Sequence, residues 1–268
     1  MKISQLVRRI IAQPRPLLLA FDLDGTLADI TADPNRTTVS PEVLNVLDAI
    51  GQHPHVHVAI VTGRDLQAFN RMVALVNLWR VVEHGGLIFS PGELAVANAV
   101  SSDKQAALHQ FETWAKATIV PRGAVLELKR TARGVHVREL AKVDPAAAEQ
   151  LVKEASSFAE TIGLYVRHGR MMVEADAVRC DKVEALEAVC KAIGSMGLVF
   201  AGDDFTDFEA IRFAQERGGI GIFVRSKERP TGPKAVVLDG PSEIKKLLLL
   251  LSDELGKSEN HPSNREVQ

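Results

Sequence analysis

The sequence predicts an α/β protein, with a parallel sheet wrapped by helices and a smaller α+β domain inserted into it. Near both ends of the chain, short apolar segments alternate with helical ones, which is the pattern of a parallel sheet. The middle of the chain instead predicts helix, hairpin, helix and hairpin. Apolar residues make up 46% and charged residues 25% of the 268 positions, a composition typical of globular proteins that can bury a sizeable core.

The first part of the core is predicted from apolar runs that end abruptly in polar residues or glycine. Such runs are typical of strands buried on both faces, and they occupy residues 16–21, 56–61 and 81–82. A helix is expected at residues 42–50, because Ser40 and Pro41 form a helix start signal. A second helix is expected at residues 65–78.

The inserted domain is predicted from a change of period near residue 100. Its two helices are expected at residues 102–117 and 145–162, the second started by Asp144 and Pro145. Alternation of apolar and polar residues predicts two hairpins, formed by residues 124–129 with 134–138 and by residues 164–167 with 171–174.

The rest of the chain returns to the alternation of the first part. Helices are expected at residues 181–193, 207–217 and 242–251, and strands at residues 198–201, 221–224 and 236–238. We therefore assign residues 1–100 and 178–255 to the core and residues 101–177 to the inserted domain. The polar residues 256–268 are expected to form a flexible tail.

Composition also excludes several classes of protein. The formal net charge of -2 argues against a nucleic-acid partner, because proteins that bind nucleic acids usually carry an excess of basic residues. No apolar run reaches the length of a membrane span, and the N-terminus lacks a leader pattern. Two cysteines, Cys180 and Cys190, provide neither a disulfide framework nor a thiolate zinc site. We expect a cytoplasmic monomer with reduced thiols and no membrane partner.

Short polar motifs follow three of the predicted core strands. They are Asp22-Leu-Asp24, Thr62-Gly63 and Gly202-Asp203-Asp204. Because the carboxyl ends of parallel strands converge at one edge of the sheet, these side chains are expected to share one crevice. Clustered carboxylates repel one another, and a hard cation that prefers oxygen ligands removes that repulsion. The sequence therefore predicts Mg²⁺ as a cofactor, with a phosphate bound near it.

The motifs also suggest a division of chemical roles. Asp22 and Asp24 lie two residues apart, so one can attack phosphorus while the other protonates the leaving oxygen and later activates water. Thr62 offers a hydroxyl to a phosphoryl oxygen. Lys182, at the start of a predicted helix, can neutralise charge on the phosphoryl group.

Taken together, these motifs resemble the haloacid dehalogenase (HAD) superfamily of phosphohydrolases. The resemblance is carried by the segments DLDGTL at 22–27, IVTGR at 60–64 and GDDFTD at 202–207, together with Lys182. It implies a HAD-like Rossmannoid core. The insert, read as αββαββ, is similar to the C2B-type caps of sugar phosphatases in this superfamily.

Further short motifs occur along nearly the whole chain: Glu83-His84-Gly85, Glu127 with Lys129, His136 with Arg138, Glu174, and Asp181-Lys182. With these, the chain resembles the trehalose-6-phosphate phosphatases within the superfamily. The resemblance implies a trehalose phosphatase of trehalose biosynthesis, with Asp22 as the aspartyl-phosphate and Asp24 as general acid and base. It also implies Mg²⁺ held by Asp22, Asp203 and the backbone carbonyl of Asp24, with Asp204 as a further candidate ligand. Asp207 would support either the metal or Lys182.

Substrate-binding residues are expected in both domains. The resemblance places Glu127, Lys129 and Glu174 on the cap, facing the sugar. Glu127 and Lys129 lie two apart on one predicted strand, hence on one face, and such groups suit the hydroxyls of a disaccharide. The remaining candidates are Gly63, Arg64, His136 and Arg138. Arg138 suits either attraction of an anionic substrate or plain surface charge.

Other functions stay open at this point. A phosphatase of another sugar phosphate, of the sucrose phosphate or mannosylglycerate phosphate type, fits the same core. A non-catalytic module that binds Mg²⁺ and phosphate is a different class, but binding alone does not need Asp24 beside Asp22. A phosphomutase, a metal-dependent nuclease and a dehalogenase fit the residues less well.

Overall fold

The computed structural model describes residues 1–31, 36–75, 77–92, 100–169, 171–179, 181–226 and 231–259. The chain divides into two compact units, residues 1–95 with 181–268 and residues 96–180. We call them the core and the cap. The predicted boundaries, after residue 100 and before residue 178, lie within a few residues of this division.

A seven-stranded sheet forms the centre of the core. Its strand order is β11-β10-β9-β1-β2-β3-β4, and neighbouring strands are parallel except for the pair β3 and β4. The strands are β1 (Leu17–Phe21), β2 (Val56–Val61), β3 (Trp79–Val82), β4 (Leu87–Phe89), β9 (Gly197–Gly202), β10 (Ile220–Arg225) and β11 (Val236–Asp239). The predicted fold class, a mostly parallel α/β sheet, is confirmed.

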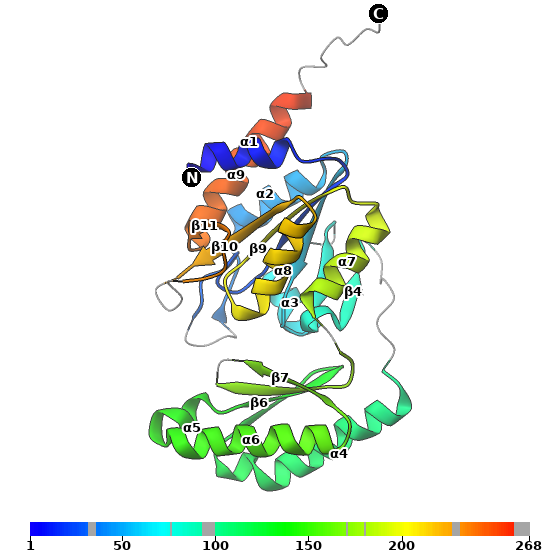
Figure 1. Ribbon diagram of the computed structural model, residues 1–268, viewed down its shortest axis with the longest axis vertical. Helices are drawn as coiled ribbons and strands as arrows, with labels where there is room; N and C mark the ends of the chain where they lie inside the picture. Colours follow the sequence, from blue (N-terminus) through cyan, green and yellow to red (C-terminus); the bar gives the residue numbers. More distant parts are fainter. Residues whose placement is uncertain are drawn as a thin grey trace, which may run out of the picture. The chain divides into compact units, whose positions relative to one another are not determined.

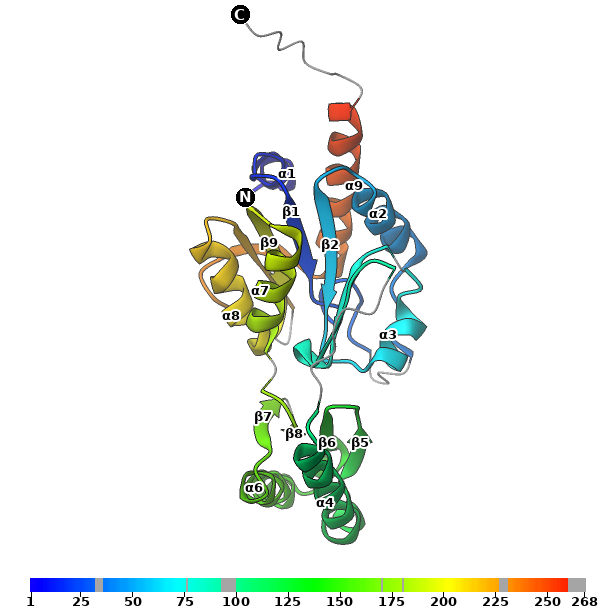
Figure 2. The same cartoon turned by 90° about the vertical axis from the view of Figure 1, so that its right-hand side faces the viewer.

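Helices cover both faces of this sheet (Figure 2). They are α1 (Ile3–Ile11), α2 (Pro41–Gly51), α3 (Leu66–Met72), α7 (Lys182–Ile193), α8 (Phe205–Glu216) and α9 (Pro241–Glu259). Helices α7 and α8 pack on one face, where Leu18, Ala20 and Phe200 are buried against their apolar stripes. Helices α2 and α9 lie on the other face and contact each other. Double coverage explains why the strands carry nearly continuous apolar runs.

The cap is a four-stranded antiparallel sheet with helices on one face (Figure 1). Its strand order is β5-β6-β8-β7, with β5 (Val125–Leu128), β6 (Ala132–His136), β7 (Tyr165–Gly169) and β8 (Met172–Asp176). The helices are α4 (Ser102–Thr118), α5 (Arg138–Val143) and α6 (Pro145–Thr161). Val135 and Val173 are buried in the hydrophobic cluster of the cap itself, beneath its helices. Residues of opposite parity therefore lie on the open face of the cap sheet.

Several predicted elements differ from the structure. Helix α3 ends at Met72 rather than at residue 78, because Val73 has an extended backbone. Helices α1 and α5 and the antiparallel strand β4 were not predicted. Helix α1 is short, but Leu6, Val7 and Ile10 are buried and it packs on α9. The additional α5 turns the predicted αββαββ order of the cap into αββααββ.

The C-terminal helix is also longer than predicted. Helix α9 was expected to end at residue 251, but it continues to Glu259. The predicted flexible tail began at residue 256, so its first part is helical, and residues 260–268 lie outside the described residues. Cys190 is a buried free thiol, whereas Cys180 is not among the described positions.

None of the described helices combines the length and the apolar character that crossing a bilayer requires.

Candidate active site

The carboxyl ends of three neighbouring strands place the predicted motifs side by side. Phe21 on β1 is in register with Ile60 on β2 and with Ala201 on β9. The next residues along each strand therefore leave the sheet at the same edge. The backbone NH of Asp22 donates to Ala201 O at 2.8 Å, which fixes the start of the first motif. The connection from β1 leads to β2 on one side of the sheet, whereas the connection from β9 leads to β10 on the other side. The carboxyl ends of β1 and β9 therefore form a topological switch point, where ligands bind in sheets of this kind.

Three buried carboxylates meet at this edge. Oxygen atoms of Asp22, Asp203 and Asp207 all lie within 4.8 Å of one another, and each side chain is nearly inaccessible to water. Gly25 allows this approach, because its φ is +80° and an added Cβ would lie 2.4 Å from the Asp203 carboxylate. A side chain at position 25 would therefore force Asp203 away.

Lys182 neutralises part of this charge. Its Nζ lies 2.5 Å from Asp22 Oδ1 and 2.6 Å from Asp207 Oδ1. Helix α7 holds Lys182 at its first position, and Asp181 caps that helix by accepting from the NH of Glu184 at 2.7 Å. A lysine at a helix N-terminus is unfavourable to the helix dipole, so the two carboxylates stabilise it there.

Asp207 and Asp204 have different surroundings from the other predicted ligands. The second oxygen of Asp207 accepts from the backbone NH of Asp204 at 2.9 Å, so both of its oxygens are engaged. The Asp204 side chain accepts from the NH of Phe205 and caps α8. In the structure, Asp207 thus contacts Lys182 directly, whereas Asp204 acts as a helix cap.

Burial and mutual repulsion perturb the ionisation of this cluster. Desolvation raises the pKa of Asp22 well above its usual value, the nearby Asp207 and Asp203 charges raise it further, and Lys182 opposes the shift. Burial by itself would lower the pKa of Lys182, but the carboxylates of Asp207 and Asp22 outweigh that effect and raise it. Lys182 therefore stays positively charged, but its single charge does not balance the carboxylates of Asp22, Asp203 and Asp207.

Asp24 is paired with Arg64. The guanidinium donates from Nε to Oδ2 at 2.7 Å and from Nη2 to Oδ1 at 2.6 Å. The Asp24 side chain is 34% exposed, far more than Asp22. The two aspartates of the first motif thus occupy different environments: Asp22 is buried against Lys182, whereas Asp24 is partly exposed and paired with Arg64.

The loop after β3 supports the Thr62 motif. Glu83, His84 and Gly85 all have positive φ, and the NH of His84 donates to Thr62 O at 2.9 Å. An added Cβ on Gly63 would lie 2.1 Å from His84 Nε2, so the imidazole lies directly over this glycine. The sequence analysis counted Glu83, His84 and Gly85 toward the family resemblance but gave them no catalytic or binding role. Its position immediately after a third core strand was the available signal.

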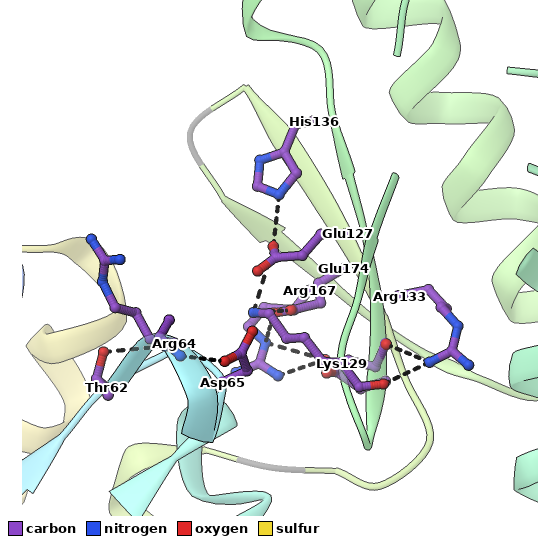
Figure 3. Close-up of polar contacts among 12 residues, drawn as sticks. Thr62, Arg64, Asp65, Glu127, Lys129, Arg133, His136, Arg167 and Glu174 are labelled. Atoms are coloured by element: carbon purple, nitrogen blue, oxygen red, sulfur yellow. Dashed lines mark hydrogen bonds and ion pairs between the residues drawn. The ribbon is translucent and has the colours of Figure 1, made fainter. Parts of the chain in front are cut away.

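On the open face of the cap, charged residues form rows across the four strands. Glu127, Gly134, Glu174 and Arg167 are successive partners in one row. Glu127 Oε2 and His136 Nε2 lie 2.8 Å apart, as Figure 3 shows. The two side chains meet above Gly134, where an added Cβ would lie 3.1 Å from Glu127 Oε2.

Lys129 and Glu174 form a buried ion pair on the same face. Lys129 Nζ lies 2.5 Å from Glu174 Oε1 and 4.0 Å from Glu127 Oε2. Burial would lower the pKa of Lys129, but the carboxylates of Glu174 and Glu127 raise it. The cap face thus carries a carboxylate, an ammonium and a second carboxylate within one cluster.

Three arginines near this cluster have distinct positions. Arg138 is exposed at the start of α5. Buried Arg133 donates from Nη1 to Lys129 O at 2.7 Å and to Ala132 O at 2.8 Å (Figure 3), closing the turn that carries Lys129. Arg167 lies beside Glu174 and was not predicted; its charge on the face of a predicted hairpin was the only signal.

The acidic cluster of the core fits a divalent cation. All three side chains offer carboxylate oxygens, which Mg²⁺ prefers, and one ammonium does not balance three buried carboxylates. The glycine at position 25 keeps the Asp203 carboxylate within reach of the cluster. Asp22 and Asp203 are the best placed donors, since Lys182 and the Asp204 backbone engage both oxygens of Asp207.

Comparison with known proteins agrees with these observations. The family model described as trehalose-phosphatase matches residues 20–238. The chain is 28% identical over 265 residues to trehalose 6-phosphate phosphatase RA3 of Zea mays, covering 91% of this chain and 72% of that protein. It is 28% identical over 259 residues to a trehalose-phosphate phosphatase of Mycobacterium leprae, covering 89% of this chain but only 58% of the relative.

A solved structure shares the fold. The C-terminal domain of trehalose-6-phosphate phosphatase from Candida albicans superposes with a TM-score of 0.76 at 22% identity, covering 95% of this chain and 98% of that one. At this identity the match shows the fold alone. The family assignment comes from the family model, which spans both sides of the cap and the cap itself. This chain therefore belongs to the trehalose-phosphatase family, a family of phosphatase enzymes in the HAD superfamily.

Proposed function

We propose that this protein hydrolyses trehalose 6-phosphate to trehalose and phosphate, with Mg²⁺ as cofactor. The observation that carries the proposal is the buried contact of Lys182 with both Asp22 and Asp207. It joins a nucleophile, a permanent cation and an acidic cluster at the switch point of the core sheet. A site that only binds phosphate would not need Asp24, the second aspartate of the motif.

In the first half-reaction, a carboxylate oxygen of Asp22 attacks phosphorus. The bond between phosphorus and the sugar oxygen breaks, and the sugar oxygen takes a proton from Asp24. Lys182 stabilises the negative charge on the reacting groups. The Thr62 hydroxyl, held by the hydrogen bond from the Thr62 NH to Val81 O at 2.8 Å, donates to a phosphoryl oxygen.

In the second half-reaction, water attacks the phosphorus of the aspartyl-phosphate. Asp24 now accepts a proton from that water, and the bond between phosphorus and Asp22 breaks. Phosphate leaves and both carboxyl groups return to their first state. Arg64, which holds Asp24 in the structure, presents a guanidinium that suits phosphoryl oxygens equally well.

When bound, Mg²⁺ would neutralise negative charge on the phosphoryl group and help to orient that group for attack. Asp22 and Asp203 are the side chains that would hold it, together with the backbone carbonyl of Asp24.

The open face of the cap supplies the groups for a sugar. Glu127, Lys129 and Glu174 offer two carboxylates that accept from hydroxyls and one ammonium that donates to them. Their contacts, 2.5 Å for Lys129 with Glu174 and 2.8 Å for Glu127 with His136, hold these groups in place before a ligand arrives. A preorganised polar face favours a substrate with many hydroxyl groups.

Phosphate release from a panel of esters tests the proposal. The panel contains trehalose 6-phosphate, sucrose 6-phosphate, glucose 6-phosphate, mannosylglycerate phosphate and an aryl phosphate, each assayed with Mg²⁺ and with a chelator. We expect release that requires Mg²⁺ and favours trehalose 6-phosphate. Preference for another sugar ester would keep the core chemistry and reject the proposed substrate.

Release from none of the esters, with Mg²⁺ bound, would favour the non-catalytic binding module. The cytoplasmic location and the monomeric state stay predictions.

A further inference from the structure

The open face of the cap sheet carries a second row of cross-strand partners beside the charged one. Val125 on β5 is in register with His136 on β6, His136 with Met172 on β8, and Met172 with Gly169 on β7. Val125 lies two positions before Glu127 on the same strand and therefore shares its face. We call these four partners the apolar row, because none of them is an acid, a lysine or an arginine.

Two side chains of the apolar row lie flat against the sheet, because each is next to a glycine. A Cβ added to Gly169 would lie 2.8 Å from Met172 Cγ and 3.2 Å from its Sδ, so the thioether covers the backbone of β7. A Cβ added to Gly134 would lie 3.3 Å from His136 Nε2. The row therefore forms a low surface, and a larger residue at position 169 would push Met172 away from the sheet.

The apolar row directly adjoins the polar groups proposed for the sugar. Glu127 Oε2 lies 2.8 Å from His136 Nε2 and 4.0 Å from Lys129 Nζ, so Glu127 lies between the two rows' polar groups (Figure 3). Val125, at the end of the apolar row, is 61% exposed. Covering such an apolar side chain with another apolar surface is favourable, and the contacts of His136 hold the row in place before a ligand arrives.

We propose that a face of a sugar ring packs on the apolar row, with Val125 and Met172 as residues that determine specificity for the sugar. A pyranose ring has hydroxyl groups around its edge and C–H groups on its faces. Ligand sites combine an apolar surface with a few polar groups that fix orientation, and the two rows supply both. The inference rests on the proposed function, because it adds two unpredicted residues to the same sugar-binding face.

A purely structural role for these residues makes a different prediction. Valine favours strands because it is β-branched, and threonine shares that shape. Val125→Thr therefore keeps the strand but replaces a methyl group by a hydroxyl. Met172→Gln likewise keeps the length of the side chain and removes its apolar character, whereas Met172→Leu keeps that character. Packing against C–H groups needs the apolar character, but the strands do not.

The test uses the full chain with trehalose 6-phosphate as substrate and with trehalose and inorganic phosphate as product inhibitors. For Val125→Thr and for Met172→Gln we expect KM for the ester and Ki for trehalose to rise about 3- to 10-fold. We expect kcat and Ki for phosphate to change less than about twofold, because neither depends on the sugar ring.

Two further variants sharpen the test. Strands β5 and β8 are separated by β6, which places Val125 and Met172 about 10 Å apart. Their effects should therefore add, and the variant with both polar changes should lose about 10- to 100-fold in the affinity for trehalose. Met172→Leu should stay within about twofold of the unaltered protein.

The same chemical changes at other exposed positions serve as matched controls. Val143 lies at the end of α5, and Met196 lies in the core. Val143→Thr and Met196→Gln should leave KM and both inhibition constants within about twofold. Hydrogen exchange of the β5 and β8 amides reports whether the cap sheet is intact in each variant.

An unchanged or lower Ki for trehalose in the double variant, with an intact sheet, would overturn the inference. A changed association state in sedimentation, with Ki for trehalose unaltered, would also overturn it, because a second copy of the chain would then cover the row. Failure of the proposed function looks different: the unaltered protein would then show no preference for trehalose 6-phosphate, before any variant is compared.

Discussion

The two polar clusters of this protein differ in charge balance and in how they are built. In the core, three buried carboxylates share one ammonium, and Asp22 is 160 positions from Lys182 in the chain. On the cap face, the charges come from strands paired in one sheet and nearly cancel. An uncompensated cluster suits a cation and a phosphoryl group, whereas a balanced one suits the neutral hydroxyls of a sugar.

The largest effect is expected from a change in the core cluster, and it should be the same for a sugar ester and for an aryl phosphate. Asp22→Asn removes the nucleophile, so turnover should fall by at least about 10⁴-fold for the sugar ester and for the aryl phosphate alike. Phosphate release and circular dichroism measure activity and folding together. Full activity in a folded variant would reject Asp22 as the nucleophile.

The second effect tests the buried charge of the core as a structural feature. Lys182→Met leaves Asp22 and Asp207 without their cation, and we expect a loss of about 3–5 kcal/mol in the free energy of unfolding. Lys245 pairs with Glu42 at a more exposed position, so Lys245→Met should lose about 1 kcal/mol or less. Urea denaturation of both variants measures the difference. Equal losses would show that the cluster does not depend on its lysine.

The third effect separates the two regions. Glu127→Ala removes a carboxylate from the cap face, so kcat/KM for trehalose 6-phosphate should fall about 10- to 100-fold. The loss for the aryl phosphate should be far smaller, because that substrate has no sugar. Glu139 is exposed on α5, and Glu139→Ala serves as the control. Equal losses on both substrates would remove Glu127 from the sugar site.

The smallest expected effect concerns pH and the cap alone. Burial raises the pKa of Asp176 to about 6, with Arg167 opposing and Glu174 adding to the shift. Because this folded value exceeds the unfolded one of about 3.9, ionising Asp176 destabilises the folded cap. The stabilising effect of protonated Asp176 is complete below about pH 4 and is lost as the pH rises through about 6.

The measurement compares Asp176→Asn with the unaltered residue at pH 4.5 and 7.5. Between these values the free energy of unfolding should shift by about 2 kcal/mol in favour of the variant. Urea unfolding followed by Trp114 fluorescence, in a Trp79→Phe background, reports on the cap. A difference that is independent of pH would contradict the raised pKa.

The alternation of strands and helices and the positions of the polar strand ends could be predicted from the sequence. The capping signals at Ser40, Asp144 and Asp181 act within a few residues, so they could be found without a fold. Helix α1 could not, because its stability comes from burying Leu6 and Ile10 against α9, more than 200 positions away.

Which side chains meet could be learned only from the folded structure. Five aspartates were candidate metal ligands from the sequence, but only the fold pairs Asp24 with Arg64 and uses Asp204 as a helix cap. Likewise, register showed Arg167 opposite Glu174, and only the observed contacts turned it towards Asp176. Local patterns depend on neighbours in the chain, whereas the pairing of charges depends on distances that exist only after the chain has folded.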